Sequence, residues 1–374
     1  MTAPGPWPAL LGAVTGLVWL ALALRLARDR RRAPRLPPAR VEAPPTTVLL
    51  PVRDEEENLA ACAATLLAQH GSPALRVIDD GSSDRTPAIL AGLAASEPRL
   101  SALRARPLAA GWGGKVNALA TGAEAVATPW LLLTDADTRH EPELLARAHA
   151  AVAEYRLDAL SLSGRQVTIG LGESLLTPAS YALLDLMLGD WRPYARGEGP
   201  TPIANGQYFL LRTDALRAIG GFDAIAGEAL DDVALATRLH AAGFKVGFLR
   251  AGEALKVRMY NGARATFRGW RRNFALFVAA RPAAALATIA LPFATAAFML
   301  LTMACGAPAA FAVCWLGGAA ASATTRKSSG NNPLTGALFP LDVLALATTL
   351  VLASADRARG RAAPWRGREI RIEK

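Results

Sequence analysis

Long stretches without charged residues set the strongest limit on how this chain can fold. Trp7–Leu24 and Ala283–Ala323 contain no charged residue, and Gly336–Ser354 contains only Asp342. A helix needs roughly 20 apolar residues to cross the hydrocarbon core of a bilayer. We therefore predict transmembrane α-helices at both ends, one N-terminal and two or three C-terminal. A removable signal peptide is the alternative for Trp7–Leu24, but the charges follow this apolar run instead of preceding it.

Basic residues lie next to both apolar regions. Residues 25–40 hold seven arginines and one aspartate, and the chain after Asp356 holds six arginines and one lysine. These are 14 of the 41 Lys and Arg that give the net charge of +10. Positive residues beside a membrane helix favour the cytoplasmic side, so we expect the central region in the cytoplasm, at the inner (plasma) membrane. The expected partner is anionic lipid and not nucleic acid, because the basic runs lack interleaved aromatic residues.

The cysteines predict neither a disulfide framework nor a metal site. Cys62, Cys305 and Cys314 have no metal-ligand spacing, and two of them lie in the C-terminal apolar region. Free thiols are typical of a reducing cytoplasm.

The region from residue 41 to about 275 alternates between short apolar runs and longer amphipathic patterns. Residues 46–52, 130–133 and the start of 75–84 are typical of buried strands, whereas 55–69 and 142–155 have helical spacing. Such alternation predicts an α/β fold, a mostly parallel sheet with helices on both faces. In these sheets ligands bind outside the carboxyl ends of the strands.

Two of the predicted strands end in pairs of acids. Asp79 and Asp80 follow one strand, and Asp135 and Asp137 follow Leu131–Leu133. Both pairs should therefore lie at one edge of the sheet. Two carboxylates at i and i+2 on a turn suit a hard divalent cation, and a bound cation suits a diphosphate. Helix capping is the alternative for either pair.

Three further stretches carry charge suited to the same site. Lys115 lies in the glycine-rich turn 111–119, where backbone can approach a phosphate, although a plain turn is an alternative. Asp231 and Asp232 open an amphipathic helix, where acids are usually caps. Arginines gather in residues 260–274, either to close on a phosphate or to anchor the chain at a membrane surface. These arginines are Arg264, Arg268, Arg271 and Arg272.

Taken together, these residues resemble glycosyltransferase family 2, which has the GT-A fold. The likeness covers about residues 44–275 and the tail. Within the family the chain looks most like membrane-bound carotenoid- and hopanoid-associated glycosyltransferases, on the segments VRMYNGARATFRGWRRN and WRGREI. The motifs of the broader likeness occur in the family's order: PVRDEEENL, VIDDGSSDRT, GWGGKVNAL, LLLTDADTRHEP, NGQYFLLRTDALRAIGGF and LDDVALATRL.

The resemblance implies a role for each of the main acids. Asp232 matches the catalytic base. Asp231 stands where the family has Glu, a departure that keeps the charge. Asp135 and Asp137 match the Asp-x-Asp pair that binds a divalent metal, Mg²⁺ or Mn²⁺, with Asp137 as the more direct ligand. Asp80 matches the acid that contacts the nucleotide base or ribose.

The donor-binding side of the expected site extends beyond these acids. Lys115 matches a contact to the nucleotide or diphosphate. Pro51, in the first motif, and Asp231 are also expected on the donor side, and Arg271 is the arginine expected there from the 260–274 cluster.

The implied reaction moves one hexose from a nucleotide-diphosphate sugar, by family habit a UDP-sugar, to a lipid or isoprenoid acceptor with inversion. Asp232 would take the proton as the acceptor oxygen attacks. Processive polysaccharide synthases carry Gln/Arg-x-x-Arg-Trp, whereas 268–272 ends in Arg, which disfavours polymer synthesis.

Residues 177–200, with Trp191 and Tyr194, form either an interfacial helix that admits a lipid or a buried helix.

Three other interpretations stay open. A processive polysaccharide synthase would need a membrane channel. A nucleotidyltransferase usually has a basic, glycine-rich loop after the first strand, whereas this chain has the acidic PVRDEEEN there. A non-catalytic membrane scaffold is disfavoured because Asp80, Asp135, Asp137 and Asp232 are all intact.

The domain organisation contains one conflict. Three C-terminal spans would place the basic tail outside, against the positive-inside tendency. An inside tail requires one hairpin in Ala283–Ala323 with a re-entrant or interfacial Pro333–Ser354, or one span fewer. The predicted segments are 1–40 (membrane helix and basic linker), 41–278 (GT-A domain), 279–355 (transmembrane helices) and 356–374 (cytoplasmic tail).

Overall fold

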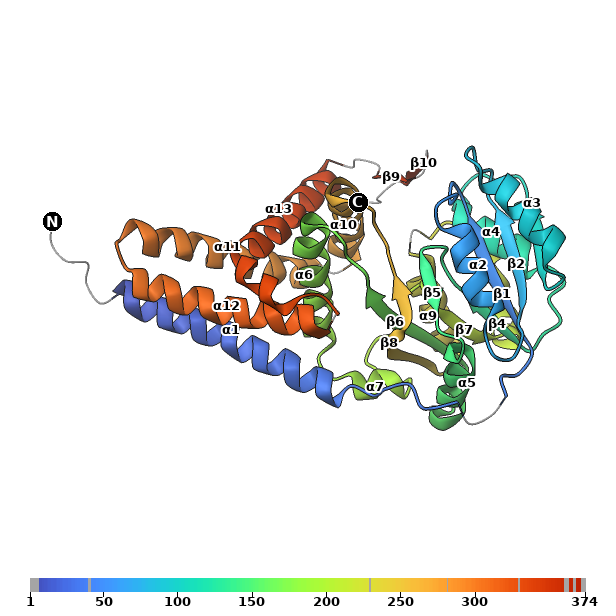
Figure 1. Cartoon of the computed structure of the whole chain (residues 1–374), viewed down its shortest axis with the longest axis horizontal. Helices are drawn as coiled ribbons and strands as arrows, with labels where there is room; N and C mark the ends of the chain where they lie inside the picture. Colours follow the sequence, from blue (N-terminus) through green and yellow to red (C-terminus); the bar gives the residue numbers. More distant parts are fainter. Residues whose placement is uncertain are drawn as a thin grey trace. The chain divides into compact units, whose positions relative to one another are not determined.

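The computed structural model describes residues 7–39, 42–228, 230–280, 282–328, 330–359, 363–365 and 368–370. The chain divides into two compact units (Figure 1). The predicted domain limits stay predictions, and residues 166–189, expected in the GT-A domain, belong to the second unit. The sheet unit is Ala33–Arg165 and Asp190–Val257, and the helical unit is Met1–Arg32, Gln166–Gly189 and Arg258–Lys374.

An eight-stranded sheet forms the centre of the sheet unit. Its strands are β1 (Thr46–Val52), β2 (Ala74–Asp79), β3 (Leu100–Arg104), β4 (Trp130–Leu133), β5 (Thr138–His140), β6 (Ala159–Gln166), β7 (Phe209–Arg212) and β8 (Val246–Val257). The strand order is β3-β2-β1-β4-β7-β6-β8-β5. Strands β3, β2, β1 and β4 are mutually parallel, so their carboxyl ends share one edge of the sheet.

The parallel half forms as its apolar runs predict. Leu49, Val77 and Leu132 are fully buried on three neighbouring strands. Parallel strands need crossover connections, and helices supply three of them: α2 (Leu59–Leu67), α3 (Thr86–Ser96) and α4 (Gly114–Ala123).

The other half of the sheet contains antiparallel pairs, so the predicted mostly parallel sheet is corrected to a mixed one. Strand β7 is antiparallel to β4 and β6, and β5 is antiparallel to β8. The pairing of Leu133 with Phe209 places the start of β7 beside the end of β4. The loop before β7 therefore lies at the edge where the parallel strands end.

Helices and a short 3₁₀ turn complete the sheet unit. Leu119, Leu211 and Leu235 are buried in one core between the sheet and its helices. Trp191 and Tyr194 are buried as well, which supports the buried-helix alternative for this end of residues 177–200. The elements are α5 (Leu144–Tyr155), α7 (Trp191–Ala195), α8 (Thr213–Ala218), η1 (Gly221–Ile225) and α9 (Asp231–Ala241).

The helical unit consists of long helices. They are α1 (Trp7–Arg32), α6 (Leu171–Leu188), α10 (Ala263–Ala280), α11 (Pro282–Ala304), α12 (Pro308–Ser328) and α13 (Phe339–Ala358), with the turn η2 (Pro333–Leu338) and the tail strands β9 (Ala363–Trp365) and β10 (Arg368–Ile370). Helix α1 lies along α12 (Figure 1). A Cβ on Gly12 or Gly16 would come within 2.4 Å of Ala310 or 2.6 Å of Val313, so glycine permits this close approach.

Buried ion pairs join the helices of this unit. The guanidinium of Arg326, 1% exposed, binds the two carboxylate oxygens of Asp342 at 2.6 and 2.7 Å and links α12 to α13. Arg30 binds Asp185 at 2.6 Å and links α1 to α6. Charges removed from water are tolerated when they are paired in this way.

One helix among the described residues, Pro333–Ala358, is long and apolar enough to cross a membrane. Transmembrane helices at both ends therefore stay a prediction. Residues 283–323 do form two helices, α11 and α12, joined at Gly306 with a φ of 66°.

Candidate active site

The turn from Asp135 to Asp137 follows β4 at the carboxyl edge of the parallel strands. Thr134 is 1% exposed, whereas both acids are half-buried. The Thr138 hydroxyl donates to the Asp135 carbonyl at 2.7 Å and closes the turn. The acids that follow this buried strand therefore lie in a turn at the edge of the sheet where ligands bind in such folds.

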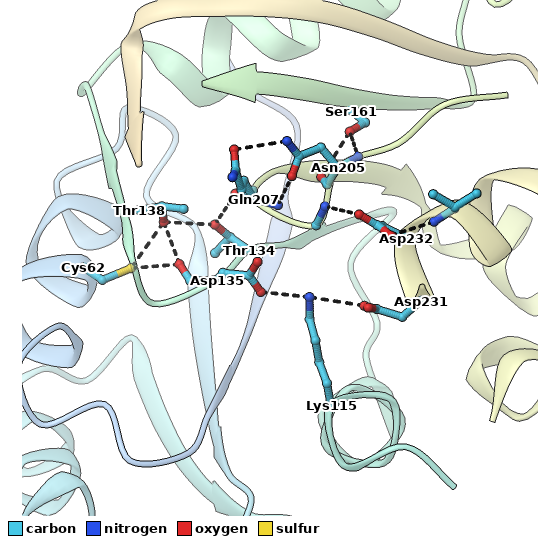
Figure 2. A network of polar contacts seen from close by, with 12 residues as sticks. Cys62, Lys115, Thr134, Asp135, Thr138, Ser161, Asn205, Gln207, Asp231 and Asp232 are labelled. Carbon is cyan, nitrogen blue, oxygen red and sulfur yellow. Dashed lines mark hydrogen bonds and ion pairs between the residues drawn. The ribbon is translucent and has the colours of Figure 1, made fainter. Parts of the chain in front are cut away.

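Lys115 joins two of the predicted acids. It is the second residue of α4, and its ammonium lies 2.9 Å from Asp135 Oδ1 and 3.2 Å from Asp231 Oδ2 (Figure 2). Burial alone would lower the pKa of Lys115, but Asp135, Asp231 and Asp232 outweigh burial and raise it. Lys115 is therefore a permanent cation between the β4 turn and the start of α9.

Asp232 is held by backbone groups. Its Oδ2 accepts a hydrogen bond from Gly206 N–H at 2.7 Å, and its Oδ1 accepts one from Val233 N–H at 2.8 Å. Burial, followed by the charge of Asp231, raises its pKa to about 6, although Lys115 and the two N–H groups oppose this. Among the described residues, Asp232 has no ion pair within 4.0 Å, so it can be a base near neutral pH.

Asp80 and Pro51 lie at the carboxyl ends of β2 and β1. Pro51 pairs with Ile78 in the sheet. Arg53 donates to the Asp80 carbonyl at 2.8 Å, and its guanidinium lies 3.7 Å from the Asp80 carboxylate. The neighbouring Asp79 instead accepts from the backbone and hydroxyl of Ser82 and closes the turn. Asp79 thus has a local structural function, and the nucleotide contact expected of Asp80 stays a prediction.

The acids fit a metal that binds together with a phosphate. No group of three or more His, Cys, Asp or Glu side chains that could hold a metal occurs in the described part of the chain. Mg²⁺ is often bound by one or two carboxylates plus substrate phosphates, and Mn²⁺ accepts the same oxygen ligands. Asp135 and Asp137 can supply two such ligands, and the rest would come from a diphosphate and water.

Residues 47–220 match the sequence profile of Glycosyl transferase family 2. This segment therefore resembles a glycosyltransferase family 2 domain. This match confirms the broader resemblance seen in the motifs over residues 47–220. It does not extend to the carotenoid- and hopanoid-associated group.

Several curated relatives match parts of the chain. The succinoglycan biosynthesis protein ExoO of Rhizobium meliloti is 32% identical over 139 residues, 35% of this chain and 38% of that protein. The beta-monoglucosyldiacylglycerol synthase of Trichormus variabilis is 28% identical over 236 residues, 62% of this chain and 48% of that protein. The matches thus span less than half the length of these relatives.

A solved structure supports the fold of the glycosyltransferase domain. It is a mannosyltransferase from Pyrobaculum calidifontis in complex with GDP-Man and Mn²⁺, with 19% identity and a TM-score of 0.54. The likeness covers 94% of this chain and 97% of that one. At this identity it shows the GT-A α/β fold, with its mixed sheet.

The candidate site contains one feature that sequence reasoning missed. Asn205, Gly206 and Gln207 precede β7 and contact the site, as the hydrogen bond from Gly206 to Asp232 shows. Their motif belonged to the family resemblance, but no role was predicted for it. A short polar loop has no periodicity, and only the antiparallel pairing of β7 brings it to the acids.

Arg271 belongs to the helical unit, on α10. Its guanidinium forms a bidentate pair with Asp356 of α13, at 2.5 and 2.6 Å. Its predicted contact with the donor stays a prediction, as does the role of the other arginines in the cluster.

Proposed function

We propose that this chain is a membrane-bound, inverting glycosyltransferase that moves one hexose from a nucleotide-diphosphate sugar to a lipid. The observation that carries the proposal is the unequal pairing of the acids. Lys115 forms ion pairs with Asp135 and Asp231, whereas Asp232 keeps a carboxylate with a pKa raised to about 6. Donor binding and proton transfer thus fall to different acids.

The proposed reaction is a single displacement. The hydroxyl oxygen of the acceptor attacks the anomeric carbon, Asp232 accepts the hydroxyl proton, and the bond between that carbon and the diphosphate oxygen breaks. Because no enzyme nucleophile takes part, one displacement inverts the anomeric configuration. Asp231, 3.2 Å from the Lys115 ammonium, keeps this cation close to the base.

The donor is proposed to be a UDP-hexose held at the carboxyl edge of the sheet. Asp80 and Pro51 would contact the nucleoside, and Lys115 the diphosphate. Asp135 and Asp137 would hold Mg²⁺ or Mn²⁺, which supplies positive charge to the leaving diphosphate when bound. Lys115 forms an ion pair with Asp135, one of the two expected metal ligands. The ammonium of Lys115 and the metal would therefore both act on the negative charge of the diphosphate.

The acceptor is proposed to be a membrane lipid. The Trichormus relative is named for glucosyldiacylglycerol synthesis and matches 62% of this chain. In the helical unit, large apolar side chains stay exposed, as expected for contact with lipid. They include Trp7, Leu10, Leu17 and Leu24 of α1, Leu300 and Met303 of α11, Leu316 of α12 and Leu344 of α13. A carotenoid or hopanoid is a narrower form of the same proposal.

We place the protein as a multi-pass protein of the inner membrane with its catalytic unit in the cytoplasm. The basic residues 25–40 that follow α1 support this orientation. Processive polysaccharide synthesis is the second candidate, because the Rhizobium relative is named for succinoglycan biosynthesis.

Membranes carrying the full chain test these alternatives. They are incubated with radiolabelled UDP-glucose and Mg²⁺ or Mn²⁺, and the label is followed into an organic extract and into insoluble polymer. We expect one labelled lipid, absent with Asp232→Asn. Label in polymer would overturn the lipid proposal in favour of a synthase, and no transfer from any UDP- or GDP-sugar would refute both.

A further inference from the structure

A short polar loop, Asn205–Gln207, holds the proposed base in place (Figure 2). The Gly206 N–H donates to Asp232 Oδ2 at 2.7 Å. The other oxygen accepts from Val233, the next residue of the same helix. Within the described part of the chain, Gly206 is therefore the hydrogen-bond donor from outside α9 that fixes the orientation of the Asp232 carboxylate.

The loop is itself fixed on both sides by buried hydroxyl groups. Ser161 of β6, fully buried, accepts from Asn205 N–H at 2.7 Å and donates to the Asn205 carbonyl at 3.1 Å. Thr134, 1% exposed, donates to the Gln207 carbonyl at 2.7 Å. The side chains of Asn205 and Gln207 also bond to each other at 3.1 Å. The peptide between them thus has little freedom to rotate.

The middle of this loop faces the charged groups directly. A Cβ on Gly206 would lie 2.8 Å from Lys115 Nζ, 3.5 Å from Asp135 Oδ2 and 3.7 Å from Asp232 Oδ2. The absence of a side chain therefore leaves room for the Lys115 ammonium. The loop backbone itself forms one wall of the space between the donor-side acids and the base.

We propose that Ser161 and Thr134 are positioning residues for sugar transfer, acting through the Gly206 N–H that orients Asp232. The inference rests on the proposed function, because it needs Asp232 to be the base. Thr134 directly precedes Asp135. Its hydroxyl therefore connects two segments, the turn expected to bind the donor and the loop that orients the base. Errors in the placement of a reacting group lower turnover more than they lower ground-state binding.

Two variants of the full chain in membranes test this role. With Ser161→Ala or Thr134→Val, we expect kcat to fall about 10- to 100-fold while the donor KM stays nearly unchanged. We also expect the acid limb of the pH profile to move to higher pH, because the Gly206 hydrogen bond lowers the pKa of Asp232. Asp231 and Lys115, the charged groups that face Asp232, remain in both variants. Thr134→Ser keeps the hydroxyl and should restore kcat.

Thr213→Val is the matched control. It removes a buried hydroxyl at the other end of β7, where Thr213 donates to the Thr128 carbonyl at 2.7 Å. This variant should keep the wild-type kcat and pH profile even if it is less stable. If Ser161→Ala fails to fold, the near-isosteric Thr134→Val and the variant Thr134→Ser test the positioning role.

The outcomes separate this inference from the proposed function. Wild-type kcat and an unmoved acid limb in the variants, with an active wild type and an inactive Asp232→Asn, would overturn the positioning role alone. An increase only in donor KM would also overturn it. A wild type that transfers no sugar from any donor would overturn the proposed function, and the positioning role would fall with it.

Discussion

At the scale of single residues, Lys115 distinguishes the acids of the site, because it forms ion pairs with Asp135 and Asp231. Sequence reasoning selected Lys115, Asp135, Asp231 and Asp232, and the structure brings these four together. The sequence could not show the pairing, because it depends on how closely α4 approaches the start of α9. Nor could it show that Asp79 closes a turn by accepting hydrogen bonds from Ser82.

The raised pKa of Asp232 predicts an acid limb in the activity. The base must be ionised, so kcat/KM should fall as the pH drops through about 6. Asp231 is one of the causes of the raised pKa, and its negative charge disfavours ionisation of Asp232. In Asp231→Asn the Asp232 pKa should fall toward the ordinary aspartate value of about 4, and the acid limb should move to lower pH.

A surface acid provides the control for this pH measurement. Asp223, with 73% of its side chain exposed, pairs with Arg106 at 3.5 Å. Asp223→Asn should leave the acid limb in place. An acid limb that is the same in wild type and Asp231→Asn would show that the two carboxylates do not interact as described.

At the scale of elements, the neighbouring parallel strands β1, β2 and β4 were predicted from the sequence, whereas β5, β7 and β8 were not. β4 is a continuous apolar run, and β1 contains one from Val48 to Val52, because strands buried on both faces need apolar side chains. β5 and β7 have 3 and 4 residues, too few for a periodic pattern. β8 is long but contains Gly247, Gly252 and Glu253, which weakens any strand pattern.

The central strand β4 should dominate the stability of the sheet unit. Leu132 is fully buried between β1 and β7. Leu132→Ala should lower the free energy of unfolding by about 2–5 kcal/mol, through lost burial and the cavity left behind. The control is Leu108→Ala, which truncates a side chain that is 41% exposed. Thermal unfolding of the purified protein measures both, and equal melting temperatures would contradict the assigned core.

At the scale of the whole molecule, the apolar segments predicted at both ends of the chain form the helical unit. Composition alone indicated these helices, because long uncharged runs leave few alternatives. It could not indicate that residues 166–189, from the middle of the chain, also belong to this unit. Long-range pairs such as Arg30 with Asp185 hold this segment there, and they leave no local pattern in the sequence.

The proposed orientation can be tested with a native cysteine. Cys305 lies at the turn between α11 and α12 and is partly exposed, whereas Cys62 and Cys314 are buried. If the catalytic unit is cytoplasmic and α11 crosses the membrane, this turn lies on the outer side. A membrane-impermeant maleimide should therefore label right-side-out vesicles, and Cys305→Ser should abolish the labelling. Labelling only of inside-out vesicles, or of neither kind, would contradict this topology.

The most direct test of the account compares transfer and nucleotide binding in the wild type and Asp232→Asn at saturating donor. A general base contributes about 10²- to 10⁴-fold, so the variant should lose that much kcat. Its affinity for UDP should stay close to that of the wild type, because Lys115 and the Asp135 turn are untouched. Near-normal turnover in Asp232→Asn would contradict the assignment of Asp232 as the base, and with it the proposed division of roles among the acids.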